Sequence, residues 1–72
     1  MNQYLVAVYK IHLELGYLTT AIEYCKEAYQ LMLKFNPHEA AELYVEMKMQ
    51  LRQFDPEKYN DDYEPDEDWF DI

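Results

Sequence analysis

Few side chains in this sequence are of a type that does chemistry, and their spacing argues against an active site. His12 and His38 fall in different predicted helices, and neither has a cysteine or a cluster of acids at metal-ligand spacing. We expect His12 at the edge of the core and His38 on the surface. Cys25 lies on a predicted apolar stripe, so we expect a buried, unreactive thiol. A Cys25–His12 pair would have no pocket to work in, and we therefore expect no enzyme, no metal site and no cofactor.

The acids near the end of the sequence do not complete a calcium site. Asp62, Glu64 and Asp66 alternate as they do at the start of a calcium-binding loop. Glu67 then stands where such a loop needs glycine for its sharp turn. The sequence also has no serine and only one glycine, which excludes a serine nucleophile and a glycine-rich phosphate-binding loop.

The composition is that of a small, acidic protein. The 72 residues are enough for one small domain, and 15 Asp and Glu against 6 Lys and Arg give a formal net charge of -9. Aromatic residues make up 17%, a share too high for a disordered chain. So much negative charge repels nucleic acid, and we expect no direct binding to DNA or RNA. Because no apolar run is long enough to span a membrane and one cysteine cannot form an internal disulfide, we expect a soluble, intracellular protein of the cytoplasm.

The negative charge is concentrated in the last quarter of the sequence. Residues 1–54 hold six acids and five bases, a net charge of -1, whereas residues 55–72 hold nine acids and Lys58, a net charge of -8. This division predicts a nearly neutral body over 1–54 and an acidic tail over 55–72. Two prolines and clustered like charges argue against a stable helix in the tail, which we expect to be flexible. The bases of the body are scattered along the sequence, so we expect the tail not to fold back onto it.

The body reads as three helices. Apolar residues at helical spacing predict a first helix from about Gln3 to Leu15, ended by Gly16 as a left-handed cap. A second helix begins near Thr20, which has the spacing of a capping box with Glu23.

The third helix has the clearest start signal. Asn36 serves as N-cap, Pro37 stands at the first helical position and Glu39 completes the box. The helix runs to about Gln53, before Asp55-Pro56 stops it. The apolar stripes predicted to form the core are Leu5, Val8, Tyr9, His12 and Leu15 in the first helix; Ala21, Tyr24, Cys25, Ala28, Leu31, Met32 and Phe35 in the second; and Ala40, Tyr44, Met47, Leu51 and Phe54 in the third.

The stretch from Leu15 to Leu31 resembles the centre of a tetratricopeptide (TPR) repeat. That family has a glycine in the turn between its two helices, an alanine early in the second helix and another alanine seven residues later; Gly16, Ala21 and Ala28 match these positions. Small residues on that face let two helices approach closely. The resemblance covers about one repeat, residues 4–35, and implies a TPR-like helical hairpin with the third helix as a capping helix.

The sequence departs from the family pattern at three places. Tyr9 stands where the family prefers a small residue, and His12 stands where it prefers an aromatic one. The proline that closes a repeat would fall at Leu33, but the break comes about one turn later at Pro37.

One such repeat cannot bury its own apolar surface, because the architecture needs about three repeats to form a continuous core. The third helix would cover one side of the hairpin and leave part of the other exposed. An exposed apolar patch of this kind usually marks an interface, so we expect self-association or a permanent protein partner. The residues predicted for this partner-binding face are Tyr4, Ile11, Ile22, Tyr29 and Leu33.

The tail combines its acids with aromatic residues that a purely solvating segment does not need. This composition is typical of a recognition peptide that becomes ordered on a partner with a basic groove. We expect Trp69 and Phe70 to be its anchors; the alternative is a tail that only keeps the protein soluble. The predicted partner-binding residues of the tail are Tyr63, Asp66, Glu67, Asp68, Trp69, Phe70, Asp71 and Ile72.

These features predict an all-α protein that acts as a small protein–protein interaction module, either an adaptor or a regulatory subunit. One alternative is an inhibitor that mimics nucleic acid, since carboxylates can occupy a groove for phosphates and aromatic rings can replace stacked bases. Another alternative is a structural subunit of a larger assembly, in which the tail threads over a basic neighbour. Competition separates the two: DNA and salt should displace a nucleic-acid mimic from its partner, whereas a complex formed by apolar docking should survive both.

Overall fold

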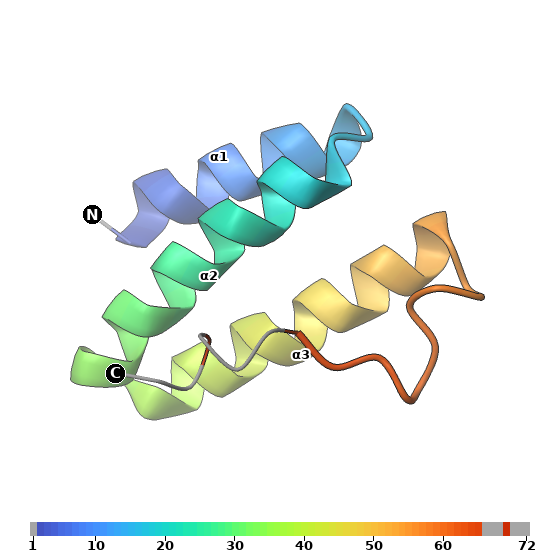
Figure 1. The fold of residues 1–72 in the computed structure, drawn as a ribbon. Helices are drawn as coiled ribbons and strands as arrows, with labels where there is room; N and C mark the ends of the chain where they lie inside the picture. The colour runs from blue at the N-terminus through green and yellow to red at the C-terminus, as the bar shows by residue number, and fades with distance from the viewer. Residues whose placement is uncertain (1, 66–68, 70–72) are drawn as a thin grey trace.

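The computed structural model describes residues 2–65 and 69, and its regular structure is helical (Figure 1). Helix α1 spans Asn2–Glu14, α2 spans Leu18–Phe35 and α3 spans Pro37–Phe54. The all-α class is confirmed over these residues. Helix α2 is central, because its backbone packs against both α1 and α3. After α3 the chain turns back and runs beside α3 towards the middle of the molecule (Figure 1).

The turn between α1 and α2 is closed by glycine, as predicted. Gly16 has a φ of 83°, in the left-handed region that only glycine adopts without cost. Its amide donates to the carbonyl of Leu13 at 3.1 Å, and the amide of Tyr17 donates to the carbonyl of His12 at 2.9 Å. These two bonds are those of a Schellman motif, which satisfies the last carbonyls of a helix.

Replacing Gly16 by alanine should lower the free energy of unfolding by about 1–2 kcal/mol, the cost of a left-handed conformation at a residue with a Cβ. A Cβ at this position has no atom within 4 Å, so the loss reflects backbone conformation rather than a clash. Urea unfolding followed by circular dichroism measures it. Gly16→Asn is the control: asparagine tolerates this conformation better, and the interpretation fails if both variants lose the same amount.

The start of α2 differs from the prediction. The helix begins at Leu18, its N-cap is Tyr17, and no side chain caps it. The amide of Ala21 already donates to the carbonyl of Tyr17 at 2.9 Å. The chain therefore leaves the glycine turn in helical geometry, and Thr20 lies within the first turn of α2. The capping box of Thr20 and Glu23 was a wrong prediction.

The junction of α2 and α3 follows the prediction closely. Asn36 ends one helix and caps the next: its side-chain oxygen accepts from the amide of Glu39 at 3.2 Å, and Pro37 opens α3. The Glu39 carboxylate accepts from the side-chain amide of Asn36 at 3.0 Å. The carboxylate thus binds the side chain of the cap, where the usual capping box uses its backbone amide.

The core forms where α2 meets its two neighbours, and parts of the predicted stripes lie outside it. Leu15, Leu31, Phe35 and Phe54 were predicted for the core but are exposed. Spacing along a helix identifies its apolar side, whereas the width of the buried arc depends on how many elements surround it. The buried apolar side chains of the three helices are Tyr9, Leu13, Ala21, Cys25, Ala28, Tyr29, Met32, Ala40, Leu43, Met47 and Leu51.

Candidate functional site

The segment after α3 folds back and covers the groove between α2 and α3. We call residues 55–65 together with Trp69 the return segment. Tyr59, Pro65 and Trp69 of this segment are buried, and Trp69 is only 2% exposed. The expectation that the tail stays apart from the body is therefore wrong for the described residues. The predicted partner-binding residues Asp66, Glu67, Asp68, Phe70, Asp71 and Ile72 lie outside the described residues.

Trp69 lies against Tyr29 and Tyr44, and we call these two tyrosines the aromatic cage. Its ring centroid is 5.4 Å from that of Tyr29 on α2 and 5.8 Å from that of Tyr44 on α3. The two tyrosine rings are themselves 5.9 Å apart. Tilted and edge-on pairs of this kind each contribute about 0.5–1.5 kcal/mol beyond the area that they bury. One tryptophan thus joins α2 to α3 through their aromatic side chains.

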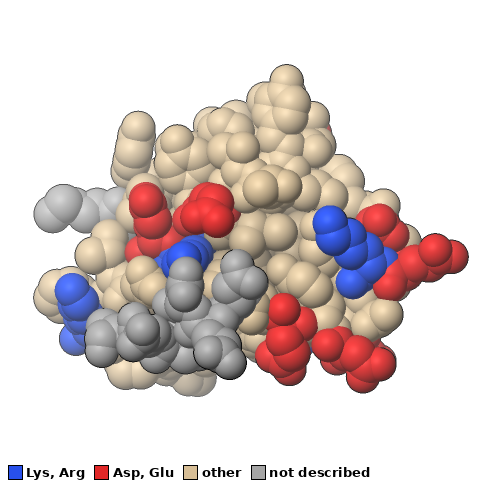
Figure 2. Space-filling view, viewed as in Figure 1, with Lys and Arg blue, Asp and Glu red and all other residues tan. Residues whose placement is uncertain are grey.

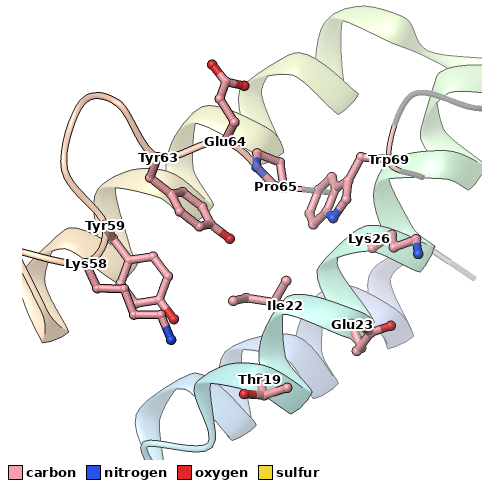
Figure 3. A pocket seen from close by; sticks show the side chains of 10 residues that line it. All are labelled: Thr19, Ile22, Glu23, Lys26, Lys58, Tyr59, Tyr63, Glu64, Pro65 and Trp69. Atoms are coloured by element: carbon pink, nitrogen blue, oxygen red, sulfur yellow. The ribbon is translucent and has the colours of Figure 1, made fainter. Parts of the chain in front are cut away.

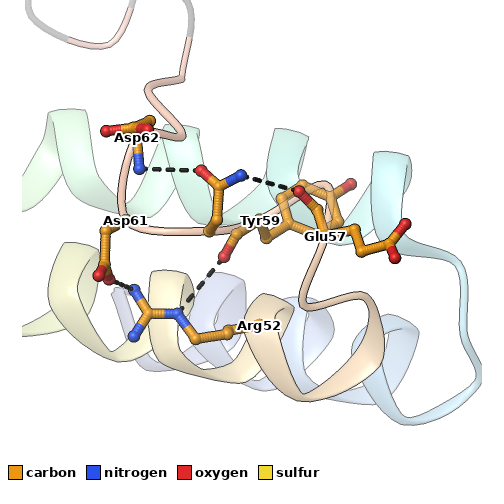
Figure 4. Close-up of polar contacts among 6 residues, drawn as sticks. Arg52, Glu57, Tyr59, Asp61 and Asp62 are labelled. Atoms are coloured by element: carbon orange, nitrogen blue, oxygen red, sulfur yellow. Dashed lines mark hydrogen bonds and ion pairs between the residues drawn. The ribbon is translucent and has the colours of Figure 1, made fainter.

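Two further contacts on α3 hold the return segment. The side chain of Arg52 donates from Nε to the carbonyl of Tyr59 at 3.4 Å, and its Nη2 lies 2.6 Å from Oδ1 of Asp61 (Figure 4). The carboxylate of Glu64 lies near Tyr44, where burial and this carboxylate raise the pKa of the phenol. Local bonds shape the turn itself: the amide of Asp62 donates to Oδ1 of Asn60 at 2.9 Å.

Three of the five body bases lie near the return segment or the aromatic cage. Lys26 of α2 lies beside the return segment, Lys48 of α3 lies 5.5 Å from the ring centroid of Tyr44, and Arg52 follows one turn later. Because Tyr44, Lys48 and Arg52 are spaced by four residues, they share one face of α3. This spacing is a signal in the sequence from which a strip of basic and aromatic residues on α3, able to bind the acidic segment, could have been predicted.

A cavity of about 210 Å³ remains between the return segment and α2. In Figure 3, Tyr63, Pro65 and Trp69 of the return segment lie across from Ile22 and Lys26 of α2. Tyr59 and Tyr63 meet edge to face at its far end, with ring centroids 4.8 Å apart. The segment thus covers the groove without filling it.

The predicted partner-binding face divides into two surfaces. Tyr29 is buried in the cage, and Ile22 and Leu33 pack partly buried against the core that the return segment helps to form. Tyr4 and Ile11 instead lie exposed on the outer side of α1.

Leu15 directly follows the end of α1 and continues its last turn, since its amide donates to the carbonyl of Ile11 at 3.1 Å. We call Tyr4, Ile11 and Leu15 the α1 face; their exposed fractions are 71%, 55% and 63%. In Figure 2 no charged side chain is visible over the upper part of the molecule, where α1 and the turn into α2 lie. The α1 face is an uncharged, apolar surface that the return segment leaves open.

The two histidines lie where the sequence predicted them. His12 is partly buried, with Nδ1 2.8 Å from the carbonyl oxygen of Val8, and its ring stacks on Tyr24 at 5.2 Å. His38 is exposed, with Nε2 2.8 Å from Oε1 of Glu42. Within residues 2–65 and 69, no three acids, histidines or cysteines gather as metal ligands do. Over the same residues, no helix is long and apolar enough to cross a membrane.

Cys25 is a fully buried, free thiol in the centre of the core. Burial, and then the charge of Glu46, raise its pKa to about 12. Burial also raises the pKa of Tyr9, whose hydroxyl has no hydrogen-bond partner in the described part of the chain. The raised pKa values keep the Cys25 thiol and the Tyr9 phenol protonated, as expected of residues that pack in a core. A cysteine nucleophile would instead have a lowered pKa.

This burial predicts a loss of stability in alkali. The unfolded chain releases the Cys25 proton near pH 9.0, whereas the folded chain keeps it to about pH 12. Between these values the unfolded state binds fewer protons, so the free energy of unfolding falls as the pH rises. Urea unfolding at a series of pH values measures the slope. The slope should be shallower in Cys25→Ala, and an equal slope in both proteins would contradict the assignment.

Comparisons of the chain with protein-family models, with curated proteins and with solved structures give no match.

Proposed function

We propose that this chain is a small, non-enzymatic protein–protein interaction module, an adaptor or regulatory subunit built on a TPR-like pair of helices. The observation that supports the proposal is the α1 face. The chain covers the groove between α2 and α3 with its own return segment, yet leaves Tyr4, Ile11 and Leu15 open to solvent. A row of large apolar side chains without charge is typical of a protein interface.

The partner that fits the α1 face is an amphipathic helix from another protein. Tyr4, Ile11 and Leu15 are spaced by seven and four residues, so they form one straight row along α1. A second helix can lay its apolar stripe along such a row, as α3 lies along α2 within this chain. Lys10, which pairs with Glu46 at 3.7 Å, lies at the edge of α1 nearest α3 and would belong to the polar rim.

The test is capture by the full chain from a lysate of the source cells, followed by titration of the partner that is identified. Ile11→Glu places a charge in the centre of the α1 face and should weaken binding at least tenfold, since a buried unpaired charge is costly. Val45→Glu is the matched control, because Val45 is an equally exposed apolar residue on α3. Equal binding by both variants would refute the docking surface.

A second candidate is mimicry of nucleic acid, which the anchoring of the acidic segment favours. Arg52 holds the carboxylate of Asp61 on α3, and Asn60 accepts from the backbone amide of Asp62, so the acidic turn has a defined position on the surface (Figure 4). A mimic needs its charges held in place, as phosphates are along a backbone. If DNA or moderate salt releases the captured protein, and Ile11→Glu leaves binding intact, mimicry is the function.

A further inference from the structure

We propose that the groove between α2 and α3 is a receptor for a segment of another protein that carries a tryptophan among acidic residues. In the structure, the return segment of the chain itself occupies this groove. The site is separate from the α1 face, so this proposal goes beyond the proposed function. Each of the two can fail without the other.

The groove has the chemistry to recognise such a segment. The aromatic cage of Tyr29 and Tyr44 holds an indole, as its contacts with Trp69 demonstrate. Lys26 of α2 lines the pocket beside Trp69, and Nζ of Lys48 on α3 lies 5.5 Å from the ring centroid of Tyr44. In such recognition a large aromatic anchor supplies most of the affinity. Charges beside it select an acidic sequence and raise the rate of association.

The return segment packs against α2 only in part. It contributes Tyr59 and Trp69 to the core cluster, but it leaves an open pocket of about 210 Å³ above α2. Its ion pair with the body is solvated, since the side chain of Arg52 is 45% exposed and that of Asp61 is 90% exposed. An exposed ion pair adds little to stability.

The return segment thus competes with a foreign segment for the groove. A segment tied to the body by a short link competes at an effective concentration in the millimolar range. A foreign segment displaces it when it makes the same indole contact and also fills the cavity beside Ile22. Charge complementarity favours an acidic competitor, because residues 55–65 hold five acids and one base, and Asp61 among them pairs with Arg52 of the body.

The test uses the full chain and a synthetic peptide of residues 55–72, labelled with a fluorophore for anisotropy. Trp69→Ala empties the cage, and the peptide should bind this variant at least tenfold more tightly than the wild-type chain. Trp69 is the one tryptophan of the sequence, so in the mixture with Trp69→Ala the peptide also supplies the sole indole emission. That emission should move to shorter wavelength on binding, because the indole leaves water.

Four controls make the result specific. A peptide with alanine in place of tryptophan should not bind, and Lys48→Glu introduced together with Trp69→Ala should weaken binding at least fivefold. Circular dichroism checks that the variants keep their helices. Trp69→Phe serves as a second host chain if Trp69→Ala does not fold. It keeps a ring in the cage, so it should bind the peptide with an affinity between those of the wild-type chain and of an empty cage.

Two results would overturn the proposal. If neither host chain binds the peptide, or if both bind it no better than the wild-type chain does, the return segment is a permanent part of the core. If the wild-type chain sediments as a dimer and Trp69→Ala as a monomer, the groove receives the segment of a second copy rather than that of a foreign partner.

Discussion

We expect Met47→Ala to lower the free energy of unfolding by about 2–5 kcal/mol, the usual cost of truncating a fully buried methionine. Met47 is 0% exposed and lies on the side of α3 that faces the core. A core of this size rarely supplies more than about 3–5 kcal/mol of net stability. The variant should therefore be largely unfolded at room temperature, as seen by loss of helical circular dichroism and by the emission of Trp69.

Met49→Ala is the matched control for this prediction. Met49 is the same residue type two positions further along α3, but its side chain is 57% exposed. Its truncation should change stability by less than about 0.5 kcal/mol. Similar losses for the two methionines would mean that α3 presents a different side to the core.

The second large effect is expected from Ala28→Leu. Ala28 is 0% exposed in α2 and belongs to the same core cluster as Tyr9 and Leu13 of α1. Overpacking of a filled site costs about 1–3 kcal/mol and sometimes more, because side chains leave their preferred rotamers and the backbone moves. Thermal and urea unfolding should both show the loss, and the core contacts of α1 with α2 should loosen.

Ala41→Leu controls for the change of residue type. Ala41 lies on the exposed side of α3, so the larger side chain extends into water and stability should stay within about 0.5 kcal/mol of the wild-type value. If Ala28→Leu costs no more than Ala41→Leu, the core has room for a larger side chain at this position.

The local features of the molecule could be predicted from the sequence. Gly16 closes the first turn with a positive φ, and Asn36 caps α3 through the amide of Glu39. Cys25 lies in the core and His38 on the surface. Each of these depends on a few neighbouring residues: the helical spacing of apolar side chains, a residue that tolerates a left-handed turn, or a side chain that reaches the next helix.

The division of the apolar surface could not be predicted in the same way. Tyr4, Ile11 and Tyr29 all have the same apolar character in the sequence, but the first two remain exposed while Tyr29 is buried. The difference arises because Trp69, distant in sequence, lies against Tyr29. A helix pattern states which side is apolar and does not state which distant segment covers it.

The sequence by itself therefore determined the three helices, the glycine turn after the first, the Asn36 junction before the third and the side of each helix that seeks burial, because these follow from interactions within a turn or two of the chain. Only the tertiary structure decided where the acidic segment lies. Lys26, Lys48 and Arg52 are scattered in the sequence, but in the folded chain each lies near the return segment or the aromatic cage. The packing of α2 against α3 also brings Tyr29 and Tyr44 together, and these two rings hold Trp69 of the return segment.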